Sequence, residues 1–187
     1  MTSALPLRLR NRLAATILTA LHDDGARREL AELSREDAIG AWLEAGEDRW
    51  AAPLRARARA ASAALADRPL LAAESDLREA LRAAALLFDA GLYFEVHEAL
   101  EPHWAGAQGE SREALQGLIQ VAVAWQHFVN GNHDGARSLF TEGARRLHGA
   151  RLLGLDLEPL ARSTAEAAVG LAGGAPIAPP RFPSDET

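Results

Sequence analysis

The hydrophobic residues of this chain recur at the spacing of an α-helix through most of its length. Near the start, Leu9, Leu13, Ile17 and Leu21 follow one another every four residues and so share one helix face. Alternating runs of β-branched or aromatic residues, typical of strands, do not occur in the sequence, whereas alanine, leucine, arginine and glutamate fill most segments. The pattern predicts an all-α fold, a multihelical bundle.

Glycine and asparagine residues divide this helical pattern into segments. Two of the segments stop near Gly91 and near Gly131, in sequences that are typical of helix ends. The segment that leads to Gly131, about residues 111–130, is apolar around its whole circumference. A helix of that kind is expected to be buried on all sides. The sequence therefore predicts a bundle with a central buried helix over about 111–130.

The same breaks suggest how the chain is organised. Residues 75–150 are expected to form the core domain, and residues 1–70 a helical extension that packs on it, because the core is small by itself. Residues 151–173 are expected to form a C-terminal helix, whose helical pattern begins at about Glu158 and ends at Gly173 and Gly174. Residues 174–187 are rich in proline and polar residues, which predicts a disordered tail.

Composition narrows the classes of function. The 187 residues are 48% hydrophobic and 25% charged, as in a globular protein with a substantial core. A net charge of −6 argues against a nucleic-acid surface, and no apolar run is long enough to cross a membrane. The absence of cysteine excludes disulfides, thiolate nucleophiles and cysteine-ligated zinc. Arginine without any lysine, together with abundant alanine, suggests GC-rich codons, so we expect a cytoplasmic bacterial protein.

One stretch, "YFEVHEALEPHW" from Tyr93 to Trp104, combines apolar residues with two histidines and three glutamates. At about 100 degrees per residue, His97 falls inside the apolar face of this helix and Glu101 lies at its edge. Glu98 lies on the flank, and Glu95 points the opposite way, into solvent. The apolar face itself is made by Val96, Leu100 and Trp104. We therefore expect His97 and Glu101 to be buried together.

The central helix, "LQGLIQVAVAWQHFVNGN", carries polar residues that could face this pair. Gln116, Gln120 and His127 lie four and seven residues apart, so they line one helix face. Buried amides and imidazoles need partners, because each one left unpaired costs about 1–3 kcal/mol. The sequence predicts that His97 and Glu101 supply these partners.

Three blocks of sequence together resemble a known family. "YFEVHEALEPHW", "LQGLIQVAVAWQH" and "GNHDGARSLF" are similar, over about residues 88–147, to the helical family catalogued as domain of unknown function 309. Pro102 departs from its pattern, and the first seventy residues lie outside the resemblance. The matching residues are Phe94, Glu95, His97, Glu98, Glu101, Trp104, Gln116, Gly117, Gln120, Gly131, Asn132 and Ala136. The resemblance implies a compact helical bundle, of a kind often labelled a predicted metal-dependent hydrolase.

The first interpretation of the polar cluster is structural. His97, Glu101, Gln116, Gln120 and His127 would form a closed hydrogen-bond network that fixes the register of the helices, with no ligand. The aromatic side chains of Tyr93, Phe94 and Trp104 are expected to form the wall around the cluster.

The second interpretation is a metal-dependent hydrolase. His97, Glu101 and His127 would bind a divalent cation such as zinc, iron or manganese, assisted by Glu98 or Gln120. In an enzyme of this kind, Glu98 would be the catalytic base. The spacing His-Glu-x-x-Glu differs from the His-Glu-x-x-His of zinc proteases.

The third interpretation is a tetratricopeptide-like interaction module. "FDAGLYFEVHEAL" from Phe88 and "FVNGNHDGARSLF" from Phe128 align at an offset of 40 residues, with glycine, aromatic and small residues in register. A groove between two such helix pairs would bind a peptide partner. The sequence also leaves a homo-oligomer open.

Overall fold

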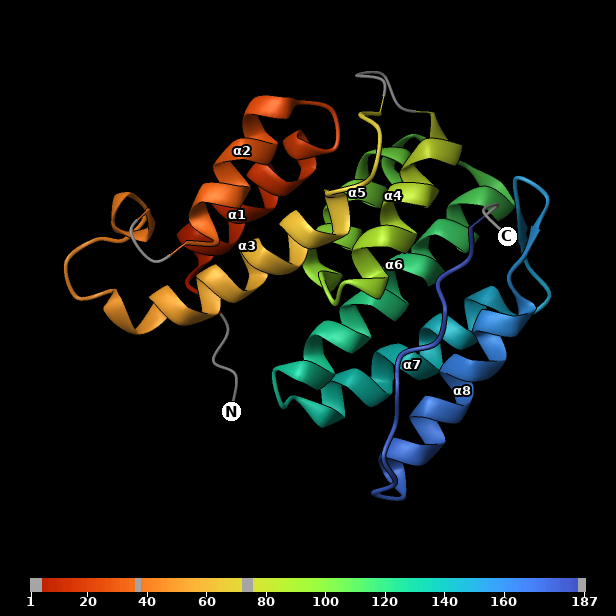
Figure 1. The fold of residues 1–187 in the computed structure, drawn as a ribbon. Coiled ribbons are helices and arrows are strands. Elements are labelled where there is room, and N and C mark those ends of the chain that lie inside the picture. The colour runs from red at the N-terminus through yellow and green to blue at the C-terminus, as the bar shows by residue number, and fades with distance from the viewer. Residues whose placement is uncertain (1–4, 36–37, 72–75, 185–187) are drawn as a thin grey trace.

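The computed structural model describes residues 5–35, 38–71 and 76–184, and the all-α prediction is confirmed (Figure 1). The first group of helices is α1 (Leu7–Ala20), α2 (Asp24–Leu33) and α3 (Ala51–Leu65), with short 3-10 turns at Ile39–Ala41 and Asp48–Trp50. The second group is α4 (Leu77–Asp89), α5 (Tyr93–Gly106), α6 (Gly109–Val129), α7 (His133–Leu147) and α8 (Glu158–Ala172).

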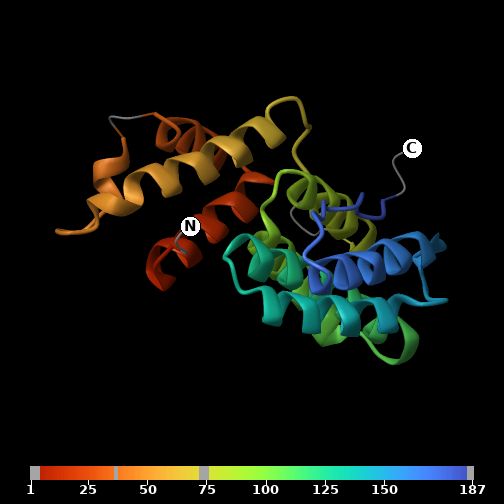
Figure 2. The same cartoon turned by 90° about the horizontal axis from the view of Figure 1, so that it is seen from below.

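The two groups lie side by side in both views of the molecule. Helices α1 to α3 are on one side of helices α4 to α8 (Figures 1 and 2). Contacts between α1 and α5, and between α3 and α4, join the groups. Helix α1 therefore packs on α5, and α3 on α4. Within the described parts of the chain, no helix combines the length and the apolar character needed to cross a lipid bilayer.

Helix α6 lies at the centre of the second group, as predicted for residues 111–130. It packs against α5 on one side and α7 on the other. Leu115, Leu118 and Val121 are fully buried on this helix. Glycine permits the close approach of α7, because a Cβ added at Gly117 would lie 2.7 Å from Leu147 Cδ2.

Helices α4–α5 and α6–α7 form two hairpins with the same turn. In the first, the Gly91 N–H donates to the Phe88 carbonyl at 2.9 Å, and Gly91 has φ 72°. In the second, the Gly131 N–H donates to the Phe128 carbonyl at 3.0 Å, and Gly131 has φ 80°. These conformations favour glycine. The offset of 40 residues between the two sequence segments therefore corresponds to a repeated backbone structure.

The C-terminal part contains a short hairpin that the sequence did not predict. Residues 151–156 form a two-stranded hairpin, β1 (Arg151–Leu152) and β2 (Leu155–Asp156), so helix α8 begins only at Glu158. The start of α8 agrees with the helical pattern, which begins at about Glu158. Strands of two residues are too short to produce an alternating pattern, which is why the hairpin before this helix was not predicted.

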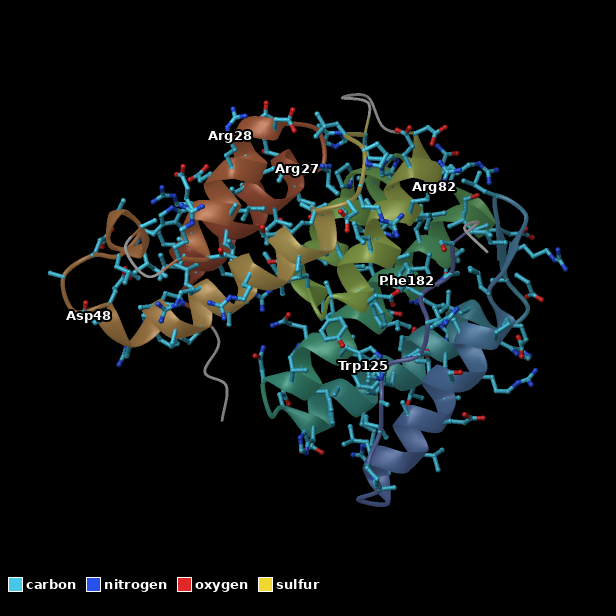
Figure 3. All side chains as sticks on the ribbon, in the orientation of Figure 1. Arg27, Arg28, Asp48, Arg82, Trp125 and Phe182 are labelled. Atoms are coloured by element: carbon cyan, nitrogen blue, oxygen red, sulfur yellow. The ribbon has the colours of Figure 1, made fainter. Side chains whose placement is uncertain are left out.

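The expected disorder of residues 174–187 does not hold for the described part, residues 174–184. Phe182, labelled in Figure 3, is buried, and its ring centroid lies 4.9 Å from that of Phe88. The polar composition of the segment predicts disorder, but one aromatic ring packed against the core holds the segment in place. Residues 185–187 lie outside the described residues.

Candidate functional site

A cavity of about 550 Å³ lies where the first group of helices meets α5 and α6. Leu5 and Arg10 contribute to it from the start of the chain, and Pro53, Ala56 and Arg57 from α3. The opposite wall consists of Phe94, His97, Val123, Gln126, His127, Val129 and Asn130. Both histidines of the predicted cluster therefore line one cavity. The wall that faces them comes from residues outside the family resemblance.

The His97 ring is held by the next residue in the sequence. Its Nδ1 lies 2.9 Å from Glu98 Oε1. A carboxylate only accepts, so Nδ1 donates its hydrogen, and Nε2 of the neutral ring keeps its lone pair. Both side chains are about one-third exposed, at 30% for His97 and 34% for Glu98. Glu98, which the sequence suggested as a catalytic base, thus orients the imidazole.

The His127 ring is held in the opposite tautomer. Asn132 caps α7, with its Oδ1 accepting the Gly135 N–H at 3.0 Å. Its amide nitrogen therefore faces His127 Nδ1, at 2.7 Å, and donates to it. The neutral His127 ring then carries its hydrogen on Nε2. A Cβ added at Gly135 would lie 2.8 Å from His127 Nδ1, so glycine leaves room for this ring.

Glu95 corrects the helical projection. The sequence predicts that it points into solvent, but its side chain is 0% exposed and pairs with Arg57 of α3. Arg57 Nη2 lies 3.0 and 2.8 Å from the two carboxylate oxygens. The projection of α5 alone could not include Arg57, whose side chain reaches this face from α3. The buried ion pair joins the two groups of helices beside the cavity.

Glu101 lies one turn beyond His97 and is exposed, which contradicts the expectation that the two residues are buried together. Donor atoms of His97, Glu98 and Glu101 nevertheless lie within 4.8 Å of one another. Imidazole and carboxylate donors suit zinc, iron or manganese, and three donors on one helix face leave coordination positions open. Within the described residues, His127 is not part of this cluster.

The glutamines of α6 do not join a common network. Gln116 Oε1 accepts the Trp104 Nε1–H at 3.2 Å. Gln120 Oε1 is buried without a hydrogen-bond partner among the described residues. The closed network of His97, Glu101, Gln116, Gln120 and His127 is therefore not assembled. His97 lines the cavity and pairs with Glu98, so it does not meet the amides of α6.

The expected aromatic wall is only partly at the cavity. Phe94 lines it, whereas Tyr93 is buried in the core, with its ring 5.0 Å from Phe88 and 6.3 Å from Trp125 (Figure 3 labels Trp125). Burial, and secondarily the charge of Asp89, raises the pKa of Tyr93. The Trp104 ring instead stacks under the Arg112 guanidinium at 4.1 Å.

Several lining residues were not predicted from the sequence. Arg10 and Arg57 lie outside the family resemblance, and their spacing gives no sign that they meet α5. Gln126 is adjacent to His127, but the pattern read along α6 selected Gln116 and Gln120 instead. Asn132 does carry a local signal, because asparagine three residues before Gly135 at a helix start is a capping pattern.

The comparisons with known proteins agree with the family resemblance. A model of the family described as domain of unknown function (DUF309) matches residues 81–139. This span begins in α4 and ends in α7, so it contains His97, Glu98 and His127 but none of the residues from α1 or α3. Neither the curated proteins nor the solved structures gave a match.

Proposed function

Because residues 81–139 belong to the DUF309 family, whose function is unknown, we propose a function from the cavity itself: the protein binds a small organic molecule between its N-terminal helices and helices α5 and α6. The observation that carries the proposal is that both His97 and His127 line one cavity of about 550 Å³. Cavities that bind small molecules have volumes of about 300–1,000 Å³.

The lining has the composition of a small-molecule site. Apolar side chains predominate, including Pro53, Phe94 and Val123. The polar groups are few, and one of them, Gln126 Oε1, is buried without a hydrogen-bond partner among the described residues. A buried oxygen without a partner costs about 1–3 kcal/mol, so Gln126 carries an unused acceptor in the wall of the cavity.

The two histidines supply complementary groups. His97 Nε2 is an acceptor, because Glu98 holds the hydrogen on Nδ1. His127 Nε2 is a donor, because Asn132 donates to Nδ1. Neighbouring side chains fix both tautomers before any ligand arrives, which reduces the cost of ordering the site on binding.

The proposal is tested by binding of N-phenyl-1-naphthylamine, a neutral probe that fluoresces in apolar surroundings. We expect Ala56→Trp, which places a ring in the cavity from α3, to weaken binding about tenfold or more. Ala63→Trp is the matched control, because Ala63 is also exposed on α3 but does not line the cavity. Absence of binding to the unmodified protein, or equal losses in both variants, would contradict the proposal.

The second candidate is metal-assisted hydrolysis, favoured by the donors of His97, Glu98 and Glu101 within 4.8 Å. These three side chains would hold the ion on α5, beside the cavity that His97 lines. A divalent cation supplies a Lewis acid and lowers the pKa of bound water. In this arrangement Glu98 would also orient the His97 ring, through its hydrogen bond to Nδ1.

Elemental analysis of protein purified without a nickel column tests this candidate. We expect about one zinc, iron or manganese ion per chain, since the described residues contain one such cluster. His97→Ala should lose the ion, whereas His148→Ala should retain it, because His148 pairs with Glu158 far from the cluster in sequence. Metal well below one ion per chain after incubation with zinc or manganese would remove the candidate.

A free peptide groove is not supported. The space beside Phe94 and His97, where a groove between the two hairpins would open, is lined on its other side by Arg10, Pro53 and Arg57. The N-terminal helices of the chain thus occupy the position that a peptide would need.

A further inference from the structure

The charge of the cavity identifies the chemical class of its ligand. We propose that it binds organic anions, with an apolar body in the cavity and an anionic head at Arg10. The inference depends on the proposed function, because it specifies the ligand of the same cavity.

The lining is unusual in charge for this chain. The described lining residues include two arginines and two histidines but no aspartate or glutamate, although the whole chain has a net charge of −6. In a cavity with low-dielectric walls, charges of one sign concentrate ligands of the opposite sign. The absence of a lining carboxylate also removes the repulsion that an anion would otherwise meet.

Arg10 is the arginine whose charge is available. The charge of Arg57 is balanced by the buried carboxylate of Glu95, at 2.8 Å. The Arg10 guanidinium lies 4.1 Å from the centroid of the Phe94 ring and donates to the neutral amide oxygen of Asn11 at 3.2 Å. Among the described residues, no carboxylate forms an ion pair with Arg10.

The stacking leaves donors for a ligand. The guanidinium has five N–H groups that lie in its plane, and an aromatic ring covers only its face. Asn11 Oδ1 accepts from Nε and from Nη2. The remaining N–H groups can donate to a carboxylate, sulfonate or phosphate. Phe94 also lines the cavity, so the cation stands beside an apolar surface where water screens it less.

Arg12, on the same helix, shows what Arg10 lacks. Its guanidinium also lies over an aromatic ring, that of Trp42, at 3.9 Å. It pairs with Glu29, with Nη2 and Oε1 3.9 Å apart, and it does not line the cavity. Arg12→Gln is therefore a matched control for Arg10→Gln, because each variant removes one stacked arginine from α1.

The experiment compares two probes that share one aromatic framework. 8-Anilinonaphthalene-1-sulfonate carries a sulfonate, and N-phenyl-1-naphthylamine lacks it. We expect the full-length protein to bind the anionic probe about tenfold or more tightly than the neutral one, since a charge-assisted contact is stronger than a neutral one. Arg10→Gln should abolish this preference while neutral-probe binding persists, and Arg12→Gln should preserve it. Added salt should weaken the binding of the anionic probe and leave the binding of the neutral probe unchanged.

The outcomes separate this inference from the proposed function. If the neutral probe binds in the cavity and the sulfonate gives no preference, or if Arg10→Gln and Arg12→Gln behave alike, the anion inference is overturned and the small-molecule site stands. If neither probe responds to Ala56→Trp, the cavity is not the binding site and both proposals fail. Circular dichroism of both arginine variants establishes that each is folded.

Discussion

The two helix hairpins share a backbone turn but differ in what surrounds it. In the turn between α4 and α5, Leu87 and Leu92 are buried in the core. The residues 40 positions later, His127 and Asn132, form the polar pair at the turn between α6 and α7. In both turns the N–H of the later residue donates to the carbonyl of the earlier one at 2.9 Å.

The comparison shows that a repeated backbone need not repeat a site. The aromatic pair also recurs, with Phe88 packed on Tyr93 and Phe128 packed on His133. Tyr93 is buried, whereas His133 is exposed. The first turn stabilises the core through apolar contacts. The second turn lies at the edge of the core, where the chain can place polar groups beside the cavity at less cost in desolvation.

The largest difference in stability between the hairpins is expected at the third residue of the second helix. This residue is Glu95 in α5 and Gly135 in α7. Glu95→Ala leaves Arg57 without its buried partner, so we expect a loss of about 3–5 kcal/mol in the free energy of unfolding, towards the lower end because Arg57 is partly exposed. Urea denaturation measures it. Glu98→Ala is the control and should change stability by less than about 0.5 kcal/mol. Similar small changes in both variants would show that the pair contributes little.

The next largest effect distinguishes the two turns directly. Leu87→Ala removes a fully buried side chain and should cost about 3 kcal/mol. His127→Ala removes the equivalent, partly exposed side chain and should cost less than about 1 kcal/mol, since one hydrogen bond to Asn132 is lost. Thermal denaturation of the two variants measures the contrast. Equal costs would mean that the second turn is as much a part of the core as the first.

Substitution of the turn glycines should affect the two hairpins equally. Gly91 and Gly131 both have positive φ, and a Cβ added at either would meet no atom within 4 Å. The cost of Gly91→Ala and Gly131→Ala is then the backbone strain alone, about 1–2 kcal/mol each. Chemical denaturation compares them. Costs that differ by more than about 1 kcal/mol would contradict the equivalence of the turns, because the strain is of that size.

The smallest effect concerns the buried aromatic residue of the first turn. Tyr93 is the sole tyrosine of the chain, so absorbance at alkaline pH reports on it alone. Burial raises its pKa, so the neutral phenol is favoured in the folded state. The stability that the neutral phenol contributes is fully present below the pKa of tyrosine in the unfolded chain. It is lost as the pH rises through the raised pKa of Tyr93 in the folded protein. Tyr93→Phe should remove that loss. An ionisation midpoint of Tyr93 in the folded protein at or below that in the unfolded chain would contradict the burial of its side chain.

How far the sequence predicts this molecule depends on whether a signal is local. The central helix and the turns at Gly91 and Gly131 follow from residues within a few positions, and they form as predicted. The burial of Glu95 depends on α3, 38 residues earlier in the chain. Phe182 is likewise held by a ring that is distant in sequence. No pattern within one helix contains these contacts.

The candidate site divides in the same way. His97 and His127 were selected because they stand out on apolar helices, and both line the cavity. Their partners within the site were assigned incorrectly, because the sequence does not show which residues of α5 meet the glutamines of α6. Gln116 accepts from Trp104, whereas His97 pairs with Glu98. Arg10 could not be assigned to the site, since nothing in its sequence surroundings indicates that α1 packs on α5.

The most direct test of the account is a crystal structure of the protein with 8-anilinonaphthalene-1-sulfonate. We expect the naphthalene ring between Phe94 and Val123, with the sulfonate within hydrogen-bond distance of the Arg10 guanidinium. A probe bound elsewhere on the surface, with the cavity filled only by solvent, would contradict the claim that the N-terminal helices and helices α5 and α6 together form a ligand site.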